Sequence, residues 1–437
     1  MKYPFMRIEE DGTEITYSDA DIYNNILVYL ERYNNKSNHF DNMTIEIPSG
    51  KLINNNGYTE KEEVYHINKI KKLKVLAINP GSDSVKIALY EENNLMFREN
   101  IKNSISELKN NLDLNLIIPS KIKKILDKLN EHSVLLEEID AFCGRAGGLT
   151  SLKEGVYRIN QKILEHARKG YSLKHYSNIG VQIAYELAKK NNKPAFTVNP
   201  VTVDELQDTS RITGIKGLYR QSIFHALNQK EVAYQYAKSI NKKYNELNLI
   251  VVHLGSGITV GVHKKGKVVD VNNALNGDGP FTTNRAGSID ATNIIDLCFS
   301  GKYTKDDLYN LITKRGGLVS LLETNDIREV IKMIQNGNKY AQLVLNAMIY
   351  QIAKQIGAMS INFKGNIDAI IITGAIANSK YFVLHLREYI DFLGKVIVMP
   401  GDMEMEALVN NTLQVMKGKK IILNYTGESM DYELPNF

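Results

Sequence analysis

Two arginines stand among small residues in a way that would let a guanidinium hold an anion. Arg145 lies in the run GRAGG and Arg285 in the run FTTNRAG. Small neighbours leave room for a ligand, and a guanidinium binds carboxylate or phosphoryl oxygens through two parallel hydrogen bonds. The flanking residues disfavour the alternative, an arginine that only faces solvent. Both arginines are therefore candidate catalytic residues for chemistry on a carboxylate or a phosphoryl group.

Glycine-containing turns recur between apolar, strand-like segments. Residues 74–90 read as a strand, the turn NPGSDS and a second strand, and residues 247–263 repeat this plan around LGSG. A third glycine turn follows the apolar run in DAIIITGAIANS. In such turns the backbone N–H groups can approach a polyanion closely. One hairpin alone is more typical of plain structure, but the three together indicate a nucleotide held between two related halves.

The segments that must position these turns predict an α/β fold from residue 74 onward. Apolar runs typical of strands occupy residues 74–78, 247–254 and 367–373, and they alternate with helical patterns at residues 177–190 and 343–363. The chain of 437 residues is too long for one ordinary core, so two or three domains are expected.

Residues 1–73 differ from the rest of the chain in composition and in hydrophobic pattern. They are polar and rich in asparagine, with a helix predicted at residues 18–33 and a short strand at residues 43–47. The basic stretch at residues 69–74 is typical of a solvated linker. We interpret this part as a small appended module whose role the sequence does not reveal.

Composition excludes several classes of protein. Hydrophobic residues make up 43% and charged residues 24% of the chain, and the net charge is only +5, with basic and acidic residues interspersed. This pattern disfavours a nucleic-acid partner. Cys143 and Cys298 cannot form a disulfide framework and have no metal-ligand spacing, so we expect buried thiols. No secretory signal and no apolar run near the roughly 18 residues of a membrane span are visible, so we expect a cytoplasmic protein without a membrane partner.

From about Lys74 to Asn424 the sequence resembles butyrate kinase, through a series of motifs in that family's order: NPGSDSVK, GRAGGL, HYSNIG, IFHALNQK, LIVVHLGSGITVGVH, VDVNNALNGDGPF, FSGKYT, TNDIREV, YQIAKQIGAM, DAIIITGAIANSKYF and PGDMEMEAL. The family groups with acetate kinase, and more distantly with sugar kinases, actin and heat-shock chaperone ATPases. The resemblance implies two ribonuclease-H-like α/β domains with mixed sheets around an interdomain nucleotide cleft. It also implies ATP/ADP and Mg²⁺ as cofactors, a short-chain carboxylate as the small-molecule substrate, and a homodimer.

The same resemblance implies a division of the chain. Residues 1–73 are an N-terminal α+β extension of unknown role, residues 74–200 and 405–437 form lobe I, and residues 201–404 form the nucleotide-binding lobe II.

The resemblance also assigns residues to roles. Those implied in catalysis are Arg145, His225, Arg285 and Asn199. Those implied in binding the nucleotide and its phosphates are Asn79, Ser82, Ser84, His253, Gly255, Ser256, Gly257, Asn325, Asp326, Arg328, Gly374, Ala375 and Ile376. Glu404 and Ser84 are implied at Mg²⁺, with Glu406 as a neighbouring alternative to Glu404. His253 is equally compatible with a satisfied histidine at a strand end, and Val201 and Phe281 are candidates for lining the acyl tail.

Four positions depart from the family pattern. Asn199 stands where Asp is general, Asp83 replaces Thr or Ser in the first turn, Ser256 replaces the middle glycine of HLGGG, and Ala375 replaces the second glycine of TGG. The first two alter charge near the expected phosphate path, and the other two add atoms beside a backbone that must approach a ligand.

Two functions therefore stay open. The first is a phosphotransferase with a carboxyl acceptor, which moves a phosphoryl group between ATP and butyrate or a related short-chain fatty acid. The alternative is a catalytically impaired paralogue that binds nucleotide as a sensor or interaction protein. Chain length of the acid is not readable from sequence, because one methylene changes binding by only about 1–3 kcal/mol.

Overall fold

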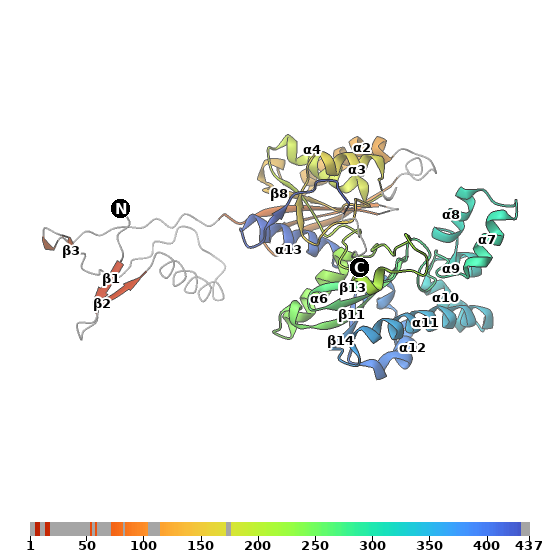
Figure 1. Cartoon of the computed structure of the whole chain (residues 1–437). Coiled ribbons are helices and arrows are strands. Elements are labelled where there is room, and N and C mark those ends of the chain that lie inside the picture. The colour runs from red at the N-terminus through yellow and green to blue at the C-terminus, as the bar shows by residue number, and fades with distance from the viewer. Residues whose placement is uncertain are drawn as a thin grey trace. The chain divides into compact units, whose positions relative to one another are not determined.

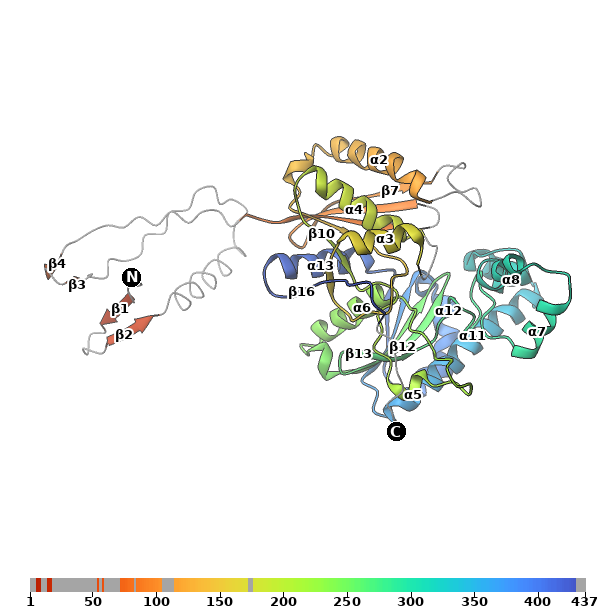
Figure 2. The same ribbon diagram turned by 45° about the horizontal axis from the view of Figure 1, so that its top comes forward.

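The computed structural model (Figures 1 and 2) describes residues 71–81, 84–103, 114–171 and 176–429, together with the backbone of four short strands nearer the N-terminus. The chain divides into two compact units, Met1–Lys72 and Leu73–Phe437.

In the first unit, two antiparallel pairs are described: β1 (Phe5–Ile8) with β2 (Glu14–Tyr17), and β3 (Ile53–Asn54) with β4 (Gly57–Tyr58). The helix predicted at residues 18–33 and the strand predicted at residues 43–47 lie outside the described residues.

The second unit contains two mixed sheets that share one plan. The first sheet has the order β16 (Ile422–Leu423), β9 (Val156–Arg158), β10 (Ala195–Val198), β8 (Ala141–Gly144), β5 (Lys74–Pro80), β6 (Ser84–Glu91) and β7 (Asn94–Lys102). The second has the order β13 (Lys267–Val271), β12 (Ile258–Lys264), β11 (Asn248–Leu254), β14 (Ala369–Gly374) and β15 (Val396–Pro400). In each, an antiparallel meander of three strands is followed by two parallel strands. The repeat predicted from the two glycine hairpins is confirmed, because β5–β6 and β11–β12 occupy equivalent places.

The helices of the second unit are α2 (Ile118–Glu131), α3 (Gln161–Lys169), α4 (Asn178–Lys190), α5 (Asp208–Arg211), α6 (Ala226–Ser239), α7 (Ala291–Phe299), α8 (Lys305–Thr313), α9 (Gly317–Leu322), α10 (Ile327–Gln335), α11 (Lys339–Ser360), α12 (Lys380–Ile390) and α13 (Glu404–Met416). Short 3-10 helices occupy Leu114–Ile117, Leu136–Glu138, Tyr244–Glu246, Ile361–Phe363, Ala375–Asn378 and Asp391–Leu393. The predicted strands at residues 74–78, 247–254 and 367–373 are β5, β11 and β14, and the predicted helices are α4 and α11.

Both sheets are covered on both faces, and the sequence of the central strands shows why. In β5, Leu76 and Ile78 join the core under α2, α3 and α4, whereas Val75 and Ala77 join the core under α13. Because successive side chains of a strand point to opposite faces, a strand that is apolar throughout must be buried on both. β11 follows the same rule, with one face against α11 and α12 and the other against α6.

Helices α6 and α13 join the two sheets (Figures 1 and 2). Leu227 of α6 lies in the same core as Met405 and Leu408 of α13, and the Asn410 amide donates a hydrogen bond of 2.7 Å to the Glu231 carboxyl group. Burial raises the pKa of Glu231. The division into lobes at residues 200 and 404 stays a prediction.

The cysteines behave differently from each other. Cys143 in β8 is buried, as predicted, and burial raises the pKa of its thiol to about 12. Cys298 is exposed on α7, so the expectation of a buried thiol is wrong there. None of the residues of α7 is buried, although its sequence, ATNIIDLCF, is largely apolar. Within the part of the chain that is described, no helix combines the length and the apolar character that crossing a bilayer requires.

Candidate functional site

Asn79 and Arg145 come together because they lie at the carboxyl ends of the neighbouring parallel strands β5 and β8. Ile78 of β5 is paired with Gly144 of β8, and the Arg145 N–H donates a hydrogen bond of 2.9 Å to the Ile78 carbonyl. The carboxyl ends of parallel strands meet at one edge of a sheet, which is where ligands bind in folds of this kind. Two polar side chains are thereby placed at this edge of the first sheet.

Glu404, which is distant in sequence from both residues, contacts Asn79 and Arg145. It is the first residue of α13, and one of its oxygens accepts hydrogen bonds from the Asn79 amide at 2.7 Å and from the Arg145 guanidinium at 2.8 Å. Burial alone would raise the pKa of Glu404, but Arg145 and Asn79 outweigh it and hold the pKa below its ordinary value. The carboxylate is therefore ionised at neutral pH.

The structure separates the two glutamates between which the sequence could not choose. Glu406 accepts a hydrogen bond of 2.6 Å from Arg98 and one of 3.1 Å from the Tyr90 hydroxyl. Two positions along a helix turn the side chain by about 200°, so only one of two such carboxylates can face a given point. Glu404 is the one beside Arg145.

The second sheet contributes the loop Gly255–Gly257, which joins β11 to β12. The Gly255 N–H donates to the Gly257 carbonyl at 3.1 Å, and the Ser256 carbonyl accepts from the Thr282 hydroxyl at 2.7 Å. A methyl group on Gly257 would lie 2.5 Å from Nη1 of Arg285 and 3.2 Å from Cε1 of His225. The loop therefore lies directly against both of these side chains.

Arg285 is a half-buried cation without a carboxylate partner among the described residues. Its recorded hydrogen bond joins Nη1 to the Ala274 carbonyl at 3.4 Å, and its Nε is buried without an acceptor in the part of the chain the structure describes. Burial lowers its pKa to about 10, so it remains charged at neutral pH. A buried charge that lacks a partner is destabilising unless a ligand supplies one.

His225 and His253 stack on each other beside this loop. Their ring centroids lie 3.7 Å apart with planes 10° from parallel. Burial lowers the pKa of His253, the charges of Asp402 and Glu404 oppose that shift, and those of Arg145 and Arg285 add to it. Both arginines of the sequence prediction therefore act on one imidazole ring, His253.

The glycine turn after β14 is required by the backbone. Gly374 has a φ of 91°, and a methyl group there would lie 2.4 Å from the Leu254 carbonyl oxygen. Ala375, in contrast, is exposed. Ile376 packs into the core of the second sheet, which places its side chain away from solvent.

Other predicted residues lie apart from this group or are used for structure. Asp326 caps α10 and pairs with the exposed Arg328, with 2.6 Å between Nη2 and Oδ2, and Asn325 is exposed beside it. Asn199 adopts a φ of 38°, and its Oδ1 accepts a hydrogen bond of 2.8 Å from the Gly155 N–H.

Five more residues that the sequence singles out have different surroundings. Ser84 is buried at the start of β6, whereas Ser82 and Asp83 lie outside the described residues. Phe281 belongs to the core of the second sheet, and the carbonyl of half-buried Val201 accepts from the Phe224 N–H at 3.1 Å.

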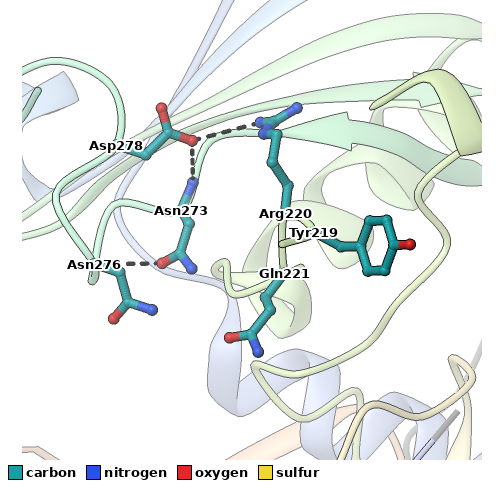
Figure 3. A pocket seen from close by; sticks show the side chains of 6 residues that line it. All are labelled: Tyr219, Arg220, Gln221, Asn273, Asn276 and Asp278. Atoms are coloured by element: carbon teal, nitrogen blue, oxygen red, sulfur yellow. Dashed lines mark hydrogen bonds and ion pairs between the residues drawn. The ribbon is translucent and has the colours of Figure 1, made fainter. Parts of the chain in front are cut away.

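A small hollow of about 360 Å³ lies between residues 219–221 and residues 273–278 (Figure 3). Its lining is polar and consists of Tyr219, Arg220, Gln221, Asn273, Asn276 and Asp278. Arg220 is already paired with Asp270 at 2.9 Å. None of the residues predicted from sequence to bind a ligand or to act in catalysis lines it.

Sequence reasoning missed the residues that hold the two histidines, namely Asn228, Gln229 and Thr259. The Asn228 amide bonds to Nδ1 of His253 at 2.9 Å, and the Thr259 hydroxyl lies 2.9 Å from Nδ1 of His225. Asn228 and Gln229 are visible in the motif IFHALNQK, immediately after His225.

Comparisons with known proteins bear on the fold of this chain and on the family that it resembles. Residues 214–419 match the model of the acetokinase family. The fold is similar to that of an acetate kinase from Porphyromonas gingivalis, with a TM-score of 0.66 and 19% identity over 79% of this chain and 100% of that one. It is also similar to a propionate kinase from Francisella tularensis subsp. tularensis SCHU S4, with a TM-score of 0.65 and 20% identity over 77% of this chain and 98% of that one. An acetate kinase from Entamoeba histolytica gives a TM-score of 0.64 and 19% identity over 78% and 99%. The predicted two-domain α/β fold with mixed sheets is thereby confirmed.

Proposed function

We propose that the chain is an ATP-dependent kinase of short-chain carboxylates, because residues 214–419 match the model of the acetokinase family. It transfers the terminal phosphoryl group of ATP to a carboxylate oxygen and yields ADP and an acyl phosphate, and the reaction is reversible. Within this class we propose butyrate or a close relative as the acid, on the strength of the motif order, and a homodimer as the assembly.

The observation that carries this proposal is the state of Arg285. A guanidinium that is half-buried, charged and without a carboxylate partner in the described chain is suited to meet an anionic ligand. It lies against the Gly257 loop and near His225, so the anion would find an arginine, a histidine and backbone N–H groups together. Phosphoryl transfer needs such positioned positive charge more than covalent chemistry.

The residues also fit the nucleotide and its metal. Because Gly255 and Gly257 carry no Cβ, the backbone of this loop comes close to His253 and Arg285, and Gly374 keeps the neighbouring turn close to β11. Glu404 is an ionised, buried carboxylate on the same side as Asn79 and Arg145. Mg²⁺ commonly takes one or two carboxylates and completes its shell with water and phosphate oxygens, so Glu404 would hold it without a protein cage. When bound, the ion would screen the negative charge of the phosphates.

Each residue then has a task in the transfer. Arg285 would bind the oxygens of the migrating group and offset the charge that accumulates on them. His225 would donate a hydrogen bond to the same group. Arg145, held in place by Glu404 and Asn79, would orient the acceptor carboxylate, so that its oxygen lies in line with the bond that breaks.

A kinetic assay with a panel of acids tests the proposal. We expect acyl hydroxamate to form from Mg-ATP with at least one of acetate, propionate, butyrate and isobutyrate. Arg285→Ala should lower kcat by about 10³-fold with an unchanged circular dichroism spectrum. Arg285→Lys should recover little, because an ammonium lacks the planar fork. Background turnover with all acids, together with nucleotide binding in calorimetry, would instead favour the impaired paralogue.

A further inference from the structure

We propose that Asn228 and Gln229, adjacent residues in the first turn of α6, fix the stacked histidines His225 and His253 in one tautomer, with a bare Nδ1 and a protonated Nε2. The two amides are positioning residues that act through the histidines. The inference rests on the proposed function, since it explains how a neutral histidine is kept as a hydrogen-bond donor toward an anion.

The orientation of Gln229 is set by a backbone group. Its Nε2 donates to the Thr259 carbonyl at 3.0 Å and to the Thr259 hydroxyl at 2.7 Å. A carbonyl only accepts, so the amide nitrogen must face it and Oε1 must face the other way. There Oε1 lies 2.9 Å from Nε2 of His263, which must therefore carry the proton of that ring.

The hydrogen bond between His263 and Tyr244 agrees with this assignment. With Nε2 of His263 protonated, its Nδ1 is bare and accepts from the Tyr244 hydroxyl at 2.7 Å. Burial lowers the pKa of His263 well below its ordinary value and raises that of Tyr244. His263 is consequently neutral and Tyr244 keeps its proton, so every donor in the series points toward His225.

The series ends on His225. The Thr259 hydroxyl already accepts from Gln229, and its own hydrogen has Nδ1 of His225, at 2.9 Å, as the recorded acceptor. The alternative, in which Nδ1 carries a proton and donates to Thr259, would leave the hydroxyl hydrogen without that acceptor. An unsatisfied buried donor is costly, so Thr259 donates and the His225 proton resides on Nε2.

A second anchor of the same kind acts on His253. The Met403 N–H donates to Oδ1 of Asn228 at 2.7 Å, and a backbone N–H only donates. The Asn228 nitrogen therefore faces Nδ1 of His253 at 2.9 Å, which must be bare. Two independent backbone contacts thus impose the same proton position on two rings whose centroids are 3.7 Å apart.

The consequence is a pair of N–H donors on stacked rings that need no positive charge on either ring. Burial lowers the pKa of His253, which agrees with a neutral ring. Beside the half-buried charge of Arg285, two cationic rings in contact would be strongly unfavourable. Neutral rings held in a chosen tautomer supply hydrogen bonds without that repulsion.

Nitrogen-15 spectra of the full chain labelled in histidine test the proposal directly, because bare and protonated ring nitrogens resonate far apart. His225→Gln and His253→Gln identify the two signals. We expect a bare Nδ1 and a protonated Nε2 on both rings near pH 7. A protonated Nδ1 on either ring overturns the proposal, whether or not the protein shows kinase activity.

Matched variants test the series of hydrogen bonds that runs from Gln229 through Thr259 to His225. Thr259→Val removes the hydroxyl at nearly constant shape and should mix the His225 tautomers and lower kcat about 10- to 100-fold, while Thr259→Ser should restore both. Thr197→Val is the control, since Thr197 is also a fully buried strand threonine but its hydroxyl has no acceptor in the described chain. It should leave the spectra and kcat unchanged. If the Thr259→Val spectrum is identical to that of the wild type, Thr259 does not set the His225 tautomer and the proposal is overturned. Correct tautomers in a chain that phosphorylates no acid would refute the proposed function and leave the inference standing.

Discussion

Gly257→Ala is the sharpest single perturbation that the site allows. Gly257 lies outside the left-handed region, so its backbone accepts alanine without strain. The new methyl group, however, would lie 2.5 Å from Nη1 and 3.0 Å from Cζ of Arg285. An ordinary contact needs at least about 3.4 Å, so the guanidinium must withdraw by about 0.9 Å. A displacement near 1 Å in a reacting group costs about 100-fold in rate.

The expected result is a loss of about 100-fold in kcat with little change in the free energy of unfolding. Replacing glycine in a permitted conformation stabilises the folded state by roughly 0.4–1 kcal/mol through the unfolded chain, which partly offsets the local clash. Initial rates of hydroxamate formation and urea unfolding of the same preparation measure the two quantities.

Gly214→Ala is the matched control, because a methyl group there meets no atom within 4 Å and the backbone has no positive φ. It should leave kcat unchanged. If Gly257→Ala turns over within a factor of three of the wild type, the position of Arg285 does not limit the reaction and our reading of the loop is wrong.

Three further predictions concern the carboxylate side of the site. The pKa of Glu404 is lower in the folded protein than its ordinary value, so its pairing with Arg145 should stabilise the fold. This stabilisation should be fully present above about pH 4.5 and should be lost as the pH falls through the lower folded pKa. Urea unfolding at a series of pH values should show the loss, and Arg145→Met should abolish this pH dependence. Glu404→Gln should raise the Mg²⁺ concentration needed for half-maximal rate, whereas Glu406→Gln should not, and equal Mg²⁺ titrations would contradict the assignment. Asn199→Asp should raise turnover while its carboxylate keeps the bond from the Gly155 N–H; an unchanged rate with intact stability would show that Asn199 does not limit catalysis.

The sequence predicted the parts of the fold that depend on periodicity. β5 and β11 each contain an unbroken apolar run, residues 75–78 and 249–252, which indicates burial on both faces, and the two hairpins repeat a plan that the sheets confirm. The exposure of helix α7 could not be predicted in this way. Its residues are mostly apolar, but the sequence does not say whether another segment covers them, and Cys298 is exposed there. Patterns along a chain carry no information on partners that come from distant segments.

The same limit applies to the site. Motif order pointed to Arg145 and Glu404 separately, but their ion pair spans 259 positions and arises only because β8 ends where α13 begins. Asn228 and Gln229 were within a quoted motif and were passed over, since amides in a helix are usually exposed. Their importance depends on burial and on backbone anchors, which only coordinates reveal. Arg328 shows the converse, because it is 85% exposed and pairs with its own helix cap.

The two arginines are not equivalent, and their surroundings explain why. Arg145 shares its charge with Glu404 at 2.8 Å, so that pair is nearly neutral before any ligand arrives and is better suited to orienting than to attracting an anion. Arg285 has no such partner in the described chain, and burial strengthens its field. Charge that develops during phosphoryl transfer therefore gains more from Arg285 than from Arg145. Removing Arg145 should then mainly raise KM for the acid, whereas removing Arg285 should mainly lower kcat.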